Sequence, residues 1–198
     1  MNDQTSKSQV AEFYEEFQSH GKYDYIYGDE ARKNLYVELI GQGNQILEVG
    51  CRSGNLTQYY HEGNEVVGVD VDRNALVEFG KRLDLESHWV DVDSEPLPFR
   101  EGQFDVVVFS EVMEHLRFPQ KTLEEIQRVL KPEGRMIGSV PNSFRLRNRL
   151  KFLFGNAFEV DVSHLRSYSH VLLRRELSTF FNRIEIHPIS RHLLGGGS

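Results

Sequence analysis

Short apolar runs alternate with segments of helical period along most of this 198-residue chain. Buried strands of a parallel sheet form continuous apolar runs, and the helices that connect them cover both faces of the sheet. The alternation therefore predicts an α/β fold of the Rossmann-like, doubly wound kind, with a mostly parallel sheet. The strands are expected at residues 45–49, 65–69, 88–90, 104–109, 135–140 and 183–187.

Apolar residues recur at helical spacing between these runs and predict the core-facing sides of three helices. The stripes are Leu76, Phe79 and Leu83; Leu123, Ile126, Val129 and Leu130; and Leu173, Leu177, Phe180 and Phe181. Lys131-Pro132-Glu133-Gly134 is typical of a helix end. Residues 145–154 mix Arg and Lys with Leu and Phe, which predicts a short amphipathic helix. Three interpretations of that helix are open: it presents a solvated face, it covers an acceptor pocket as a lid, or it forms a patch for an anionic or membrane-borne acceptor.

Three parts of the chain differ in pattern. Residues 1–40 are expected to form an N-terminal helical cap, with helices at 10–17 and 34–40. Residues 41–194 are expected to form one α/β domain, which suits a chain of this length. Residues 195–198, Gly-Gly-Gly-Ser, are expected to be a flexible tail.

Composition narrows the classes of function. The formal net charge of −7 argues against a nucleic-acid partner, because such partners need a basic face. No apolar run reaches the roughly 20 residues of a transmembrane helix. The polar N-terminus lacks the apolar core of a secretory signal, so we expect a cytoplasmic protein, either a monomer or a homodimer. A single cysteine forms no internal disulfide.

The segment that follows the first expected strand carries the strongest motif. Gly50 and Gly54 allow the backbone to turn tightly and approach a ligand. We expect a helix to follow over residues 56–60, with its N-terminus available to an anion. A dinucleotide fingerprint would require glycines at positions 50, 52 and 55, whereas this chain has Arg52 and Asn55. The spacing therefore disfavours a nicotinamide oxidoreductase.

Acidic residues follow the second and third expected strands. Asp70 lies 20 residues after Gly50 (70 − 50), where a carboxylate can accept both hydroxyls of a ribose. The alternative is an exposed acid in an ordinary β–α loop. Asp91 can accept a hydrogen bond from an adenine amino group, and the backbone N–H of Val92 can donate to a ring nitrogen.

Together these motifs resemble the class I S-adenosylmethionine-dependent methyltransferases, of the type 11 or type 12 group that includes ubiquinone-biosynthesis enzymes. The motifs are Leu47–Gly54, Val69-Asp70, Asp91 with Pro96–Phe99, Phe104–Ser110 and Leu130–Gly134. The resemblance implies S-adenosylmethionine as cofactor, with contacts from Glu48, Gly50, Cys51, Gly54, Asp70, Val71, Asp91, Val92, Ser110 and Glu111. Glu48 and the glycine loop would hold the methionine end, while Ser110 and Glu111 would close the site. The family often has a third glycine at the position of Arg52.

Methyl transfer to oxygen needs a base or a metal ion near the acceptor. On a helix, Glu111, Glu114 and His115 would share one face. With His164 they are similar to the metal-binding set of small-RNA 2′-O-methyltransferases, which implies a possible divalent-ion site. Alternatively, His115 or His164 is a metal-free base, or His115 only caps the helix or packs below the pocket.

We therefore expect an enzyme that moves a methyl group from S-adenosylmethionine to a small-molecule acceptor. A hydroxyl oxygen is preferred, because the fourth strand ends in Phe-Ser-Glu-Val and lacks the Asn-Pro-Pro-Tyr type of signature found in many amino-group methylases. The alternative is a non-catalytic module that binds S-adenosylmethionine and supports a partner.

Overall fold

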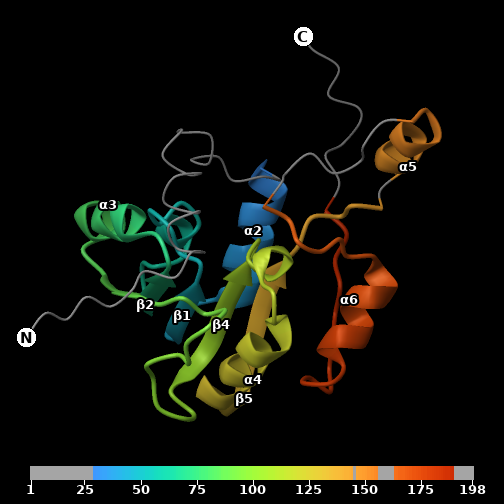
Figure 1. The fold of residues 1–198 in the computed structure, drawn as a ribbon. Coiled ribbons are helices and arrows are strands. Elements are labelled where there is room, and N and C mark those ends of the chain that lie inside the picture. Colours follow the sequence, from blue (N-terminus) through green and yellow to red (C-terminus); the bar gives the residue numbers. More distant parts are fainter. Residues whose placement is uncertain (1–28, 145, 156–162, 190–198) are drawn as a thin grey trace, which may run out of the picture.

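The computed structural model describes residues 29–144, 146–155 and 163–189. Within these ranges one parallel sheet has the strand order β3-β2-β1-β4-β5 (Figure 1). The strands are β1 (Gln45–Val49), β2 (Glu65–Asp70), β3 (Glu86–Trp89), β4 (Phe104–Ser110) and β5 (Leu130–Ser139). Successive strands add to one side of β1 and then to the other. This reversal confirms the expected doubly wound, Rossmann-like fold.

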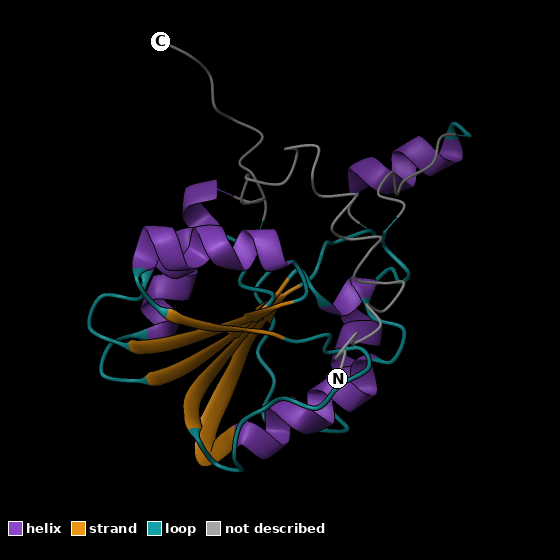
Figure 2. Cartoon of the chain, turned by 60° about the vertical axis from the view of Figure 1, so that its left-hand side comes forward, coloured by secondary structure: helices purple, strands orange, loops and turns teal. Residues whose placement is uncertain are grey.

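Helices cover both faces of the twisted sheet (Figure 2). The α-helices are α2 (Asp29–Ile40), α3 (Arg73–Leu83), α4 (Pro119–Val129), α5 (Leu146–Leu153) and α6 (His170–Leu177), and two 3₁₀ turns are η1 (Thr57–Tyr59) and η2 (Met113–His115). In the part of the chain that the structure describes, no helix has both the length and the apolar character needed to span a bilayer.

The alternation of side chains along β1 divides the core into two clusters. Leu47 and Val49 pack with residues of α4 and α6 on one face of the sheet. Ile46 packs on the other face with Tyr36 and Ile40 of α2. Successive side chains of a strand point to opposite faces, so Glu48 lies on the α2 side with Ile46. The strand that leads into the glycine loop is therefore buried on both faces.

Several expected elements have different limits. The strand expected at 88–90 is Glu86–Trp89, and the helix expected at 34–40 begins at Asp29. The fifth strand begins at Leu130 rather than Arg135, immediately after α4, and its pairing with β4 is irregular between Phe104 and Val106. The last helix ends at Leu177, before the end of the predicted stripe. Phe180 and Phe181 still pack against the core, from the turn that follows. Both side chains are partly buried against the core, although they lie outside the helix.

The expected strand at residues 183–187 is wrong, because the described chain forms no strand there. Arg183 instead forms an ion pair with Glu185, and both side chains are exposed. The expected helix at 10–17 and the tail at 195–198 lie outside the described residues.

The glycine at the end of β1 is required by close packing. Gly50 has φ +80°, and a Cβ atom there would lie 2.3 Å from Cγ2 of Val112. Gly43 has a similar φ of +77°, but a Cβ atom there would meet no atom within 4 Å. The two positions share the backbone strain of the left-handed region and differ in steric contact.

We predict that Gly43→Ala lowers the free energy of unfolding by about 1–2 kcal/mol, from backbone strain alone. Gly50→Ala is expected to cost about 1–3 kcal/mol more, because the added methyl group overlaps Val112. Urea unfolding of both variants measures the difference. Equal losses would contradict the close approach of Val112 to the glycine loop.

Candidate functional site

The carboxyl ends of the parallel strands meet at one edge of the sheet. In such folds, ligands bind in the crevice outside this edge, where the strand order reverses. Gly50 follows β1, Asp70 ends β2 and Ser110 ends β4. Asp91 follows β3 by two residues. The structure therefore brings the predicted cofactor residues to a common edge.

The Gly50–Gly54 segment forms a compact turn over the end of β2. The N–H groups of Gly50 and Cys51 donate to the carbonyl of Val69, at 2.8 and 3.2 Å. Arg52 adopts a left-handed φ of +47°, which accounts for the glycine that the family often has at this position. The predicted helix over 56–60 is wrong: only the 3₁₀ turn η1 follows the loop.

The carboxylate of Asp70 ties two loops together at this edge. Its Oδ2 accepts the backbone N–H of Arg52 at 2.8 Å, and its Oδ1 accepts that of Asp72 at 2.8 Å. Burial raises the pKa of Asp70, and these two hydrogen bonds oppose the shift. Each carboxylate oxygen retains a second lone pair, so the group can also accept from ligand hydroxyls. Val71 follows it, and the carbonyl of Val71 accepts the indole N–H of Trp89.

The loop after β3 is held in place by its own acidic residues. The buried carboxylate of Asp91 accepts the N–H of Asp93 at 3.2 Å. The Val92 carbonyl accepts the hydroxyl of Thr122 in α4 at 2.9 Å. The carboxylate of Asp93 accepts the backbone N–H of Arg117 at 2.9 Å and its side-chain Nε–H at 2.6 Å. These contacts fix the position of Asp91 relative to the loop after β4.

Glu48 is buried in β1 just before the glycine loop. The hydroxyls of Thr57 and Tyr60 both donate to its Oε2 at 2.5 Å. Burial raises the pKa of Glu48 to about 7, although the two hydrogen bonds lower it. Glu48 is thus a neighbour of the loop with a carboxyl group that titrates near neutral pH. Cys51 is buried as well, and burial raises the pKa of its thiol.

The end of β4 carries a polar cluster that includes a residue missed in the sequence. Arg32 of α2 is buried, donates to the hydroxyl of Ser110 and lies 3.7 Å from Oε1 of Glu111. The Tyr36 hydroxyl donates to Ser110 at 3.0 Å, and the Ser139 hydroxyl donates to Glu111 at 2.7 Å. These contacts bring a guanidinium from the N-terminal helix to the predicted site.

A sequence signal for Arg32 exists. Arg32, Tyr36 and Ile40 are spaced i, i+4 and i+8, and all three are buried on one side of α2. An arginine in line with an apolar helix face indicates either a snorkelling side chain or a buried cation with a partner. Only the fold brings Ser110, 78 residues away, to that cation.

The predicted helical face of Glu111, Glu114 and His115 does not form. Glu111 has a left-handed φ of +55° and precedes the short turn η2. Its side chain binds Ser139 and lies near Arg32, so it does not join the other three residues of the predicted metal set. Glu114, His115 and His164 do gather, with their potential ligand atoms within 4.8 Å of one another.

Hydrogen bonding orients His115 within this group. Its Nδ1 lies 3.1 Å from the carbonyl oxygen of Ser163, so Nδ1 carries the proton. The lone pair of the neutral ring is then on Nε2, which lies 4.0 Å from Oε1 of the buried Glu114. The His164 ring packs edge-on to His115, with 4.8 Å between centroids. The arrangement suits a base or a metal ligand at Nε2.

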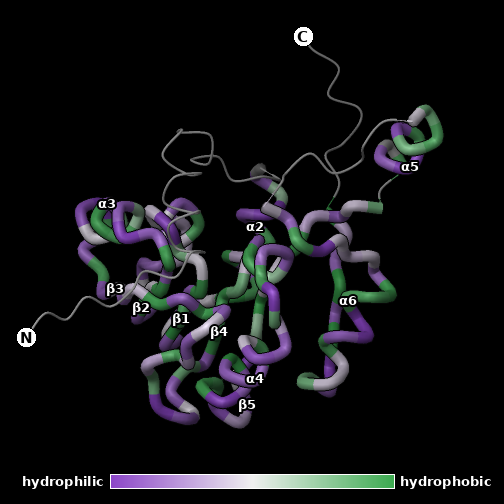
Figure 3. Tube along the Cα trace, in the orientation of Figure 1, coloured by the Kyte–Doolittle hydropathy of each residue, from purple (hydrophilic) through white to green (hydrophobic). Residues whose placement is uncertain are grey.

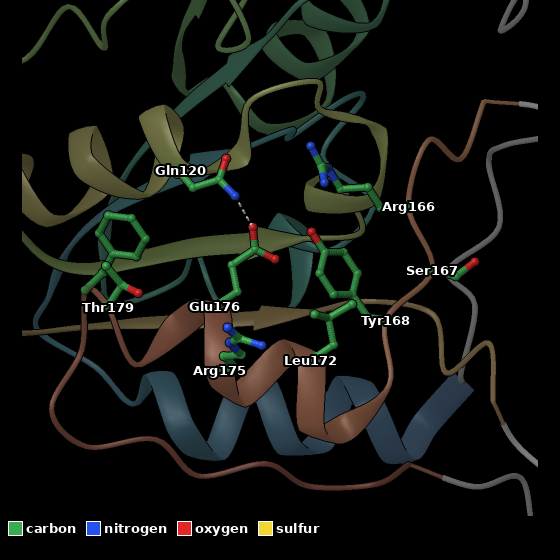
Figure 4. Close-up of a pocket in the computed structure, with 9 residues that line it drawn as sticks. Gln120, Arg166, Ser167, Tyr168, Leu172, Arg175, Glu176 and Thr179 are labelled. Atoms are coloured by element: carbon green, nitrogen blue, oxygen red, sulfur yellow. Dashed lines mark hydrogen bonds between the residues drawn. The ribbon is translucent and has the colours of Figure 1, made fainter.

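A cavity of about 470 Å³ lies elsewhere, between α4 and α6 (Figure 4). Its lining includes Arg166, Tyr168 and Arg175, and the Gln120 amide donates to Glu176 at 2.5 Å across it. None of the predicted site residues lines this cavity. The candidate site at the strand ends is therefore distinct from it.

Comparison with known proteins gives a matching family and related methyltransferases. Residues 47–138 match a family described as a methyltransferase domain. The chain is 31% identical over 108 residues to the demethylmenaquinone methyltransferase of Renibacterium salmoninarum, covering 53% of this chain and 45% of that protein. It is 30% identical over 165 residues to the ubiquinone biosynthesis O-methyltransferase of Bordetella avium, covering 76% of this chain and 66% of that protein. The chain thus spans about half to two thirds of these relatives.

Solved structures show the same fold. A SAM-dependent methyltransferase from Archaeoglobus fulgidus has a TM-score of 0.63 and 19% identity, over 76% of this chain and 66% of that one. At this identity the likeness supports the Rossmann-like architecture alone.

The raised pKa of Glu48 predicts a pH-dependent stability. Between about pH 4.5 and 7 the native state keeps a proton on Glu48 that the unfolded state has lost, so stability falls as pH rises. The loss is about 3 kcal/mol in total, at 1.36 kcal/mol per pKa unit. Urea unfolding from pH 4.5 to 8 should show this fall in the wild type and a smaller fall in Glu48→Gln. The same pH slope in both proteins would contradict the assignment.

Proposed function

Because the chain belongs to the class I S-adenosylmethionine-dependent methyltransferases, we propose that it binds S-adenosylmethionine at the carboxyl edge of the sheet and methylates a small molecule. The observation that carries the proposal is the convergence of the Gly50–Gly54 turn, Asp70 and Asp91 on adjoining strand ends. Asp70 is bonded to the glycine turn itself, so the two motifs form one unit.

Each part of the cofactor has a matching group. The Gly50–Gly54 turn and Glu48 would contact the methionine end, and Asp70 would accept the ribose hydroxyls. Asp91 and Val92 would contact the adenine. We add Arg32, because a buried guanidinium at the end of β4 is suited to the carboxylate of the methionine moiety. Ser110 and Glu111, which Arg32 contacts, would close the site.

The reaction asks little covalent chemistry of the protein. The sulfonium methyl is already electrophilic, so the protein's main contribution is to align the acceptor atom with the methyl–sulfur bond. A hydroxyl acceptor must also lose its proton. We propose His115 as the base, because its Nδ1–H is bound to the Ser163 carbonyl and its lone pair is on Nε2. His164, in ring contact with His115, is the other candidate.

A metal-assisted version of the same reaction is the second candidate. Glu114, His115 and His164 provide one carboxylate and two imidazoles within 4.8 Å, a donor set that suits a divalent cation. A bound ion would lower the pKa of the acceptor hydroxyl. Glu111, directed toward Arg32 and Ser139, is not part of this set. His115 and His164 thus serve either version, and Glu114 serves the metal-assisted one.

Cofactor binding is tested by calorimetric titration with S-adenosylhomocysteine, with NADH and ATP as controls. We predict saturable binding of the first ligand only. Asp70→Asn should weaken it about 10- to 100-fold, because a charge-assisted hydrogen bond to ribose is lost. The control Asp84→Asn changes an exposed residue at the end of α3, where Asn tolerates the left-handed backbone, and should bind like the wild type.

Absence of binding, or equal affinity in the two variants, would contradict the proposed cofactor site. Binding without turnover on any member of a broad panel of hydroxylated acceptors would favour the non-catalytic module instead.

Turnover on an accepted substrate tests His115. We predict that His115→Gln lowers the rate about 10²- to 10⁴-fold with unchanged S-adenosylhomocysteine affinity. His170→Gln, at an exposed position at the start of α6, should retain the wild-type rate. Loss of turnover with a chelator, restored by Mg²⁺ or Mn²⁺, supports the metal version, and insensitivity to chelator supports the metal-free base. Full activity of His115→Gln would rule out His115 as the base and as a metal ligand, and only His164 would then remain as the base.

A further inference from the structure

Helix α5 carries a continuous apolar face that the rest of the described chain does not cover. Leu146, Leu150 and Leu153 are spaced i, i+4 and i+7 and lie on one side of the helix. Leu146 and Leu153 are 72% and 76% exposed, and the following Phe154 is 81% exposed. Ordinary surfaces expose single large apolar residues, whereas a group of this size marks an interaction surface.

The opposite side of α5 contains one buried polar residue and the exposed Phe152. Asn148 is buried, and its amide donates to the Ser143 carbonyl at 3.0 Å. Its position on the helix is roughly opposite that of Leu146 and Leu150. The ribbons show α5 apart from the sheet and its covering helices (Figures 1 and 2). The leucines of the apolar face are therefore exposed on a helix that lies apart from the domain core.

Charge is segregated in the same segment. Residues 140–158 contain four basic residues and no acidic one, in a chain whose net charge is −7. The four are Arg145, Arg147, Arg149 and Lys151. Arg149 and Lys151 lie on the two flanks of the apolar face by helical position, and Figure 3 shows hydrophilic and hydrophobic residues intermixed along the helix. The basic flanks match an anionic surface, and the apolar face matches a hydrocarbon layer.

The residues on either side of the segment that contains α5 are bonded to residues of the candidate site. It follows Ser139, whose hydroxyl is bonded to Glu111. It returns at Ser163, whose carbonyl is bonded to His115. Anything that α5 contacts is therefore connected through short segments to both sides of the candidate site.

We propose that α5 docks the protein on the surface of an anionic lipid bilayer, with Leu146, Leu150, Leu153 and Phe154 entering the interface between headgroups and acyl chains. Arg149 and Lys151 contact the headgroups on either side. A nucleic acid would match these charges but would leave the apolar side chains in water. The docking is peripheral, and it presents the site to acceptors in or near the membrane.

Sedimentation of the full chain with lipid vesicles tests the proposal. We expect binding to vesicles of phosphatidylcholine mixed with phosphatidylglycerol, weakening as salt is raised, and little binding to phosphatidylcholine alone. Arg149→Gln and Lys151→Gln should each lower the partition coefficient about fivefold. Leu150→Gln with Leu153→Gln should lower it by at least about tenfold.

Val77→Gln and Val171→Gln are matched controls, because they replace exposed apolar residues of α3 and α6, at 55% and 74% exposure. They should bind vesicles like the wild type, and thermal melting should show that all variants fold. Absence of vesicle binding, or equal binding by the α5 and control variants, would overturn the proposal. So would self-association that the leucine variants abolish without vesicle binding, because the face would then join two copies.

Discussion

The close approach of the loop after β4 to the glycine turn after β1 is the constraint on which the site depends. β1 pairs with β2 on one side and β4 on the other, so its end has no lateral freedom. Val112 then comes so near Gly50 that a Cβ atom there would lie 2.3 Å from it. The contact holds the Gly50–Gly54 turn, where we propose cofactor contacts, against the loop that leads to Glu114 and His115. The relative position of the two loops thus depends on the pairing of β1 with its neighbours and on the absence of a side chain at Gly50.

Much of this framework is predictable from sequence, because the central strands are buried on both faces and form unbroken apolar runs. β1, β2 and β4 appear where the pattern predicts them. The run at 183–187 has the same alternation of apolar and polar residues as an edge strand, yet it pairs with nothing in the described sheet. A local sequence pattern does not show whether the fold places another strand beside the segment. The prediction of a sixth strand is wrong for this reason.

Some of the residues at the candidate site were predicted from the sequence, and others were not. Asp70 ends β2 and Asp91 follows β3, so both were predicted from their places relative to the strands, whereas Arg32 reaches Ser110 across 78 residues. Helical spacing also grouped Glu111 with Glu114 and His115, but a left-handed backbone at Glu111 directs it to Arg32 and Ser139 instead. A sequence period predicts a shared face only where the backbone is helical. His164, 49 residues from His115, joins the group through the fold.

The central claim is that the cofactor binds at the carboxyl edge of the sheet, and a crystal structure of the chain with S-adenosylhomocysteine tests it most directly. The account predicts density for the ribose against the Asp70 carboxylate and for the methionine carboxylate near Arg32, with the sulfur directed toward His115. Density for the ligand in the cavity between α4 and α6, with the strand ends empty, would contradict it.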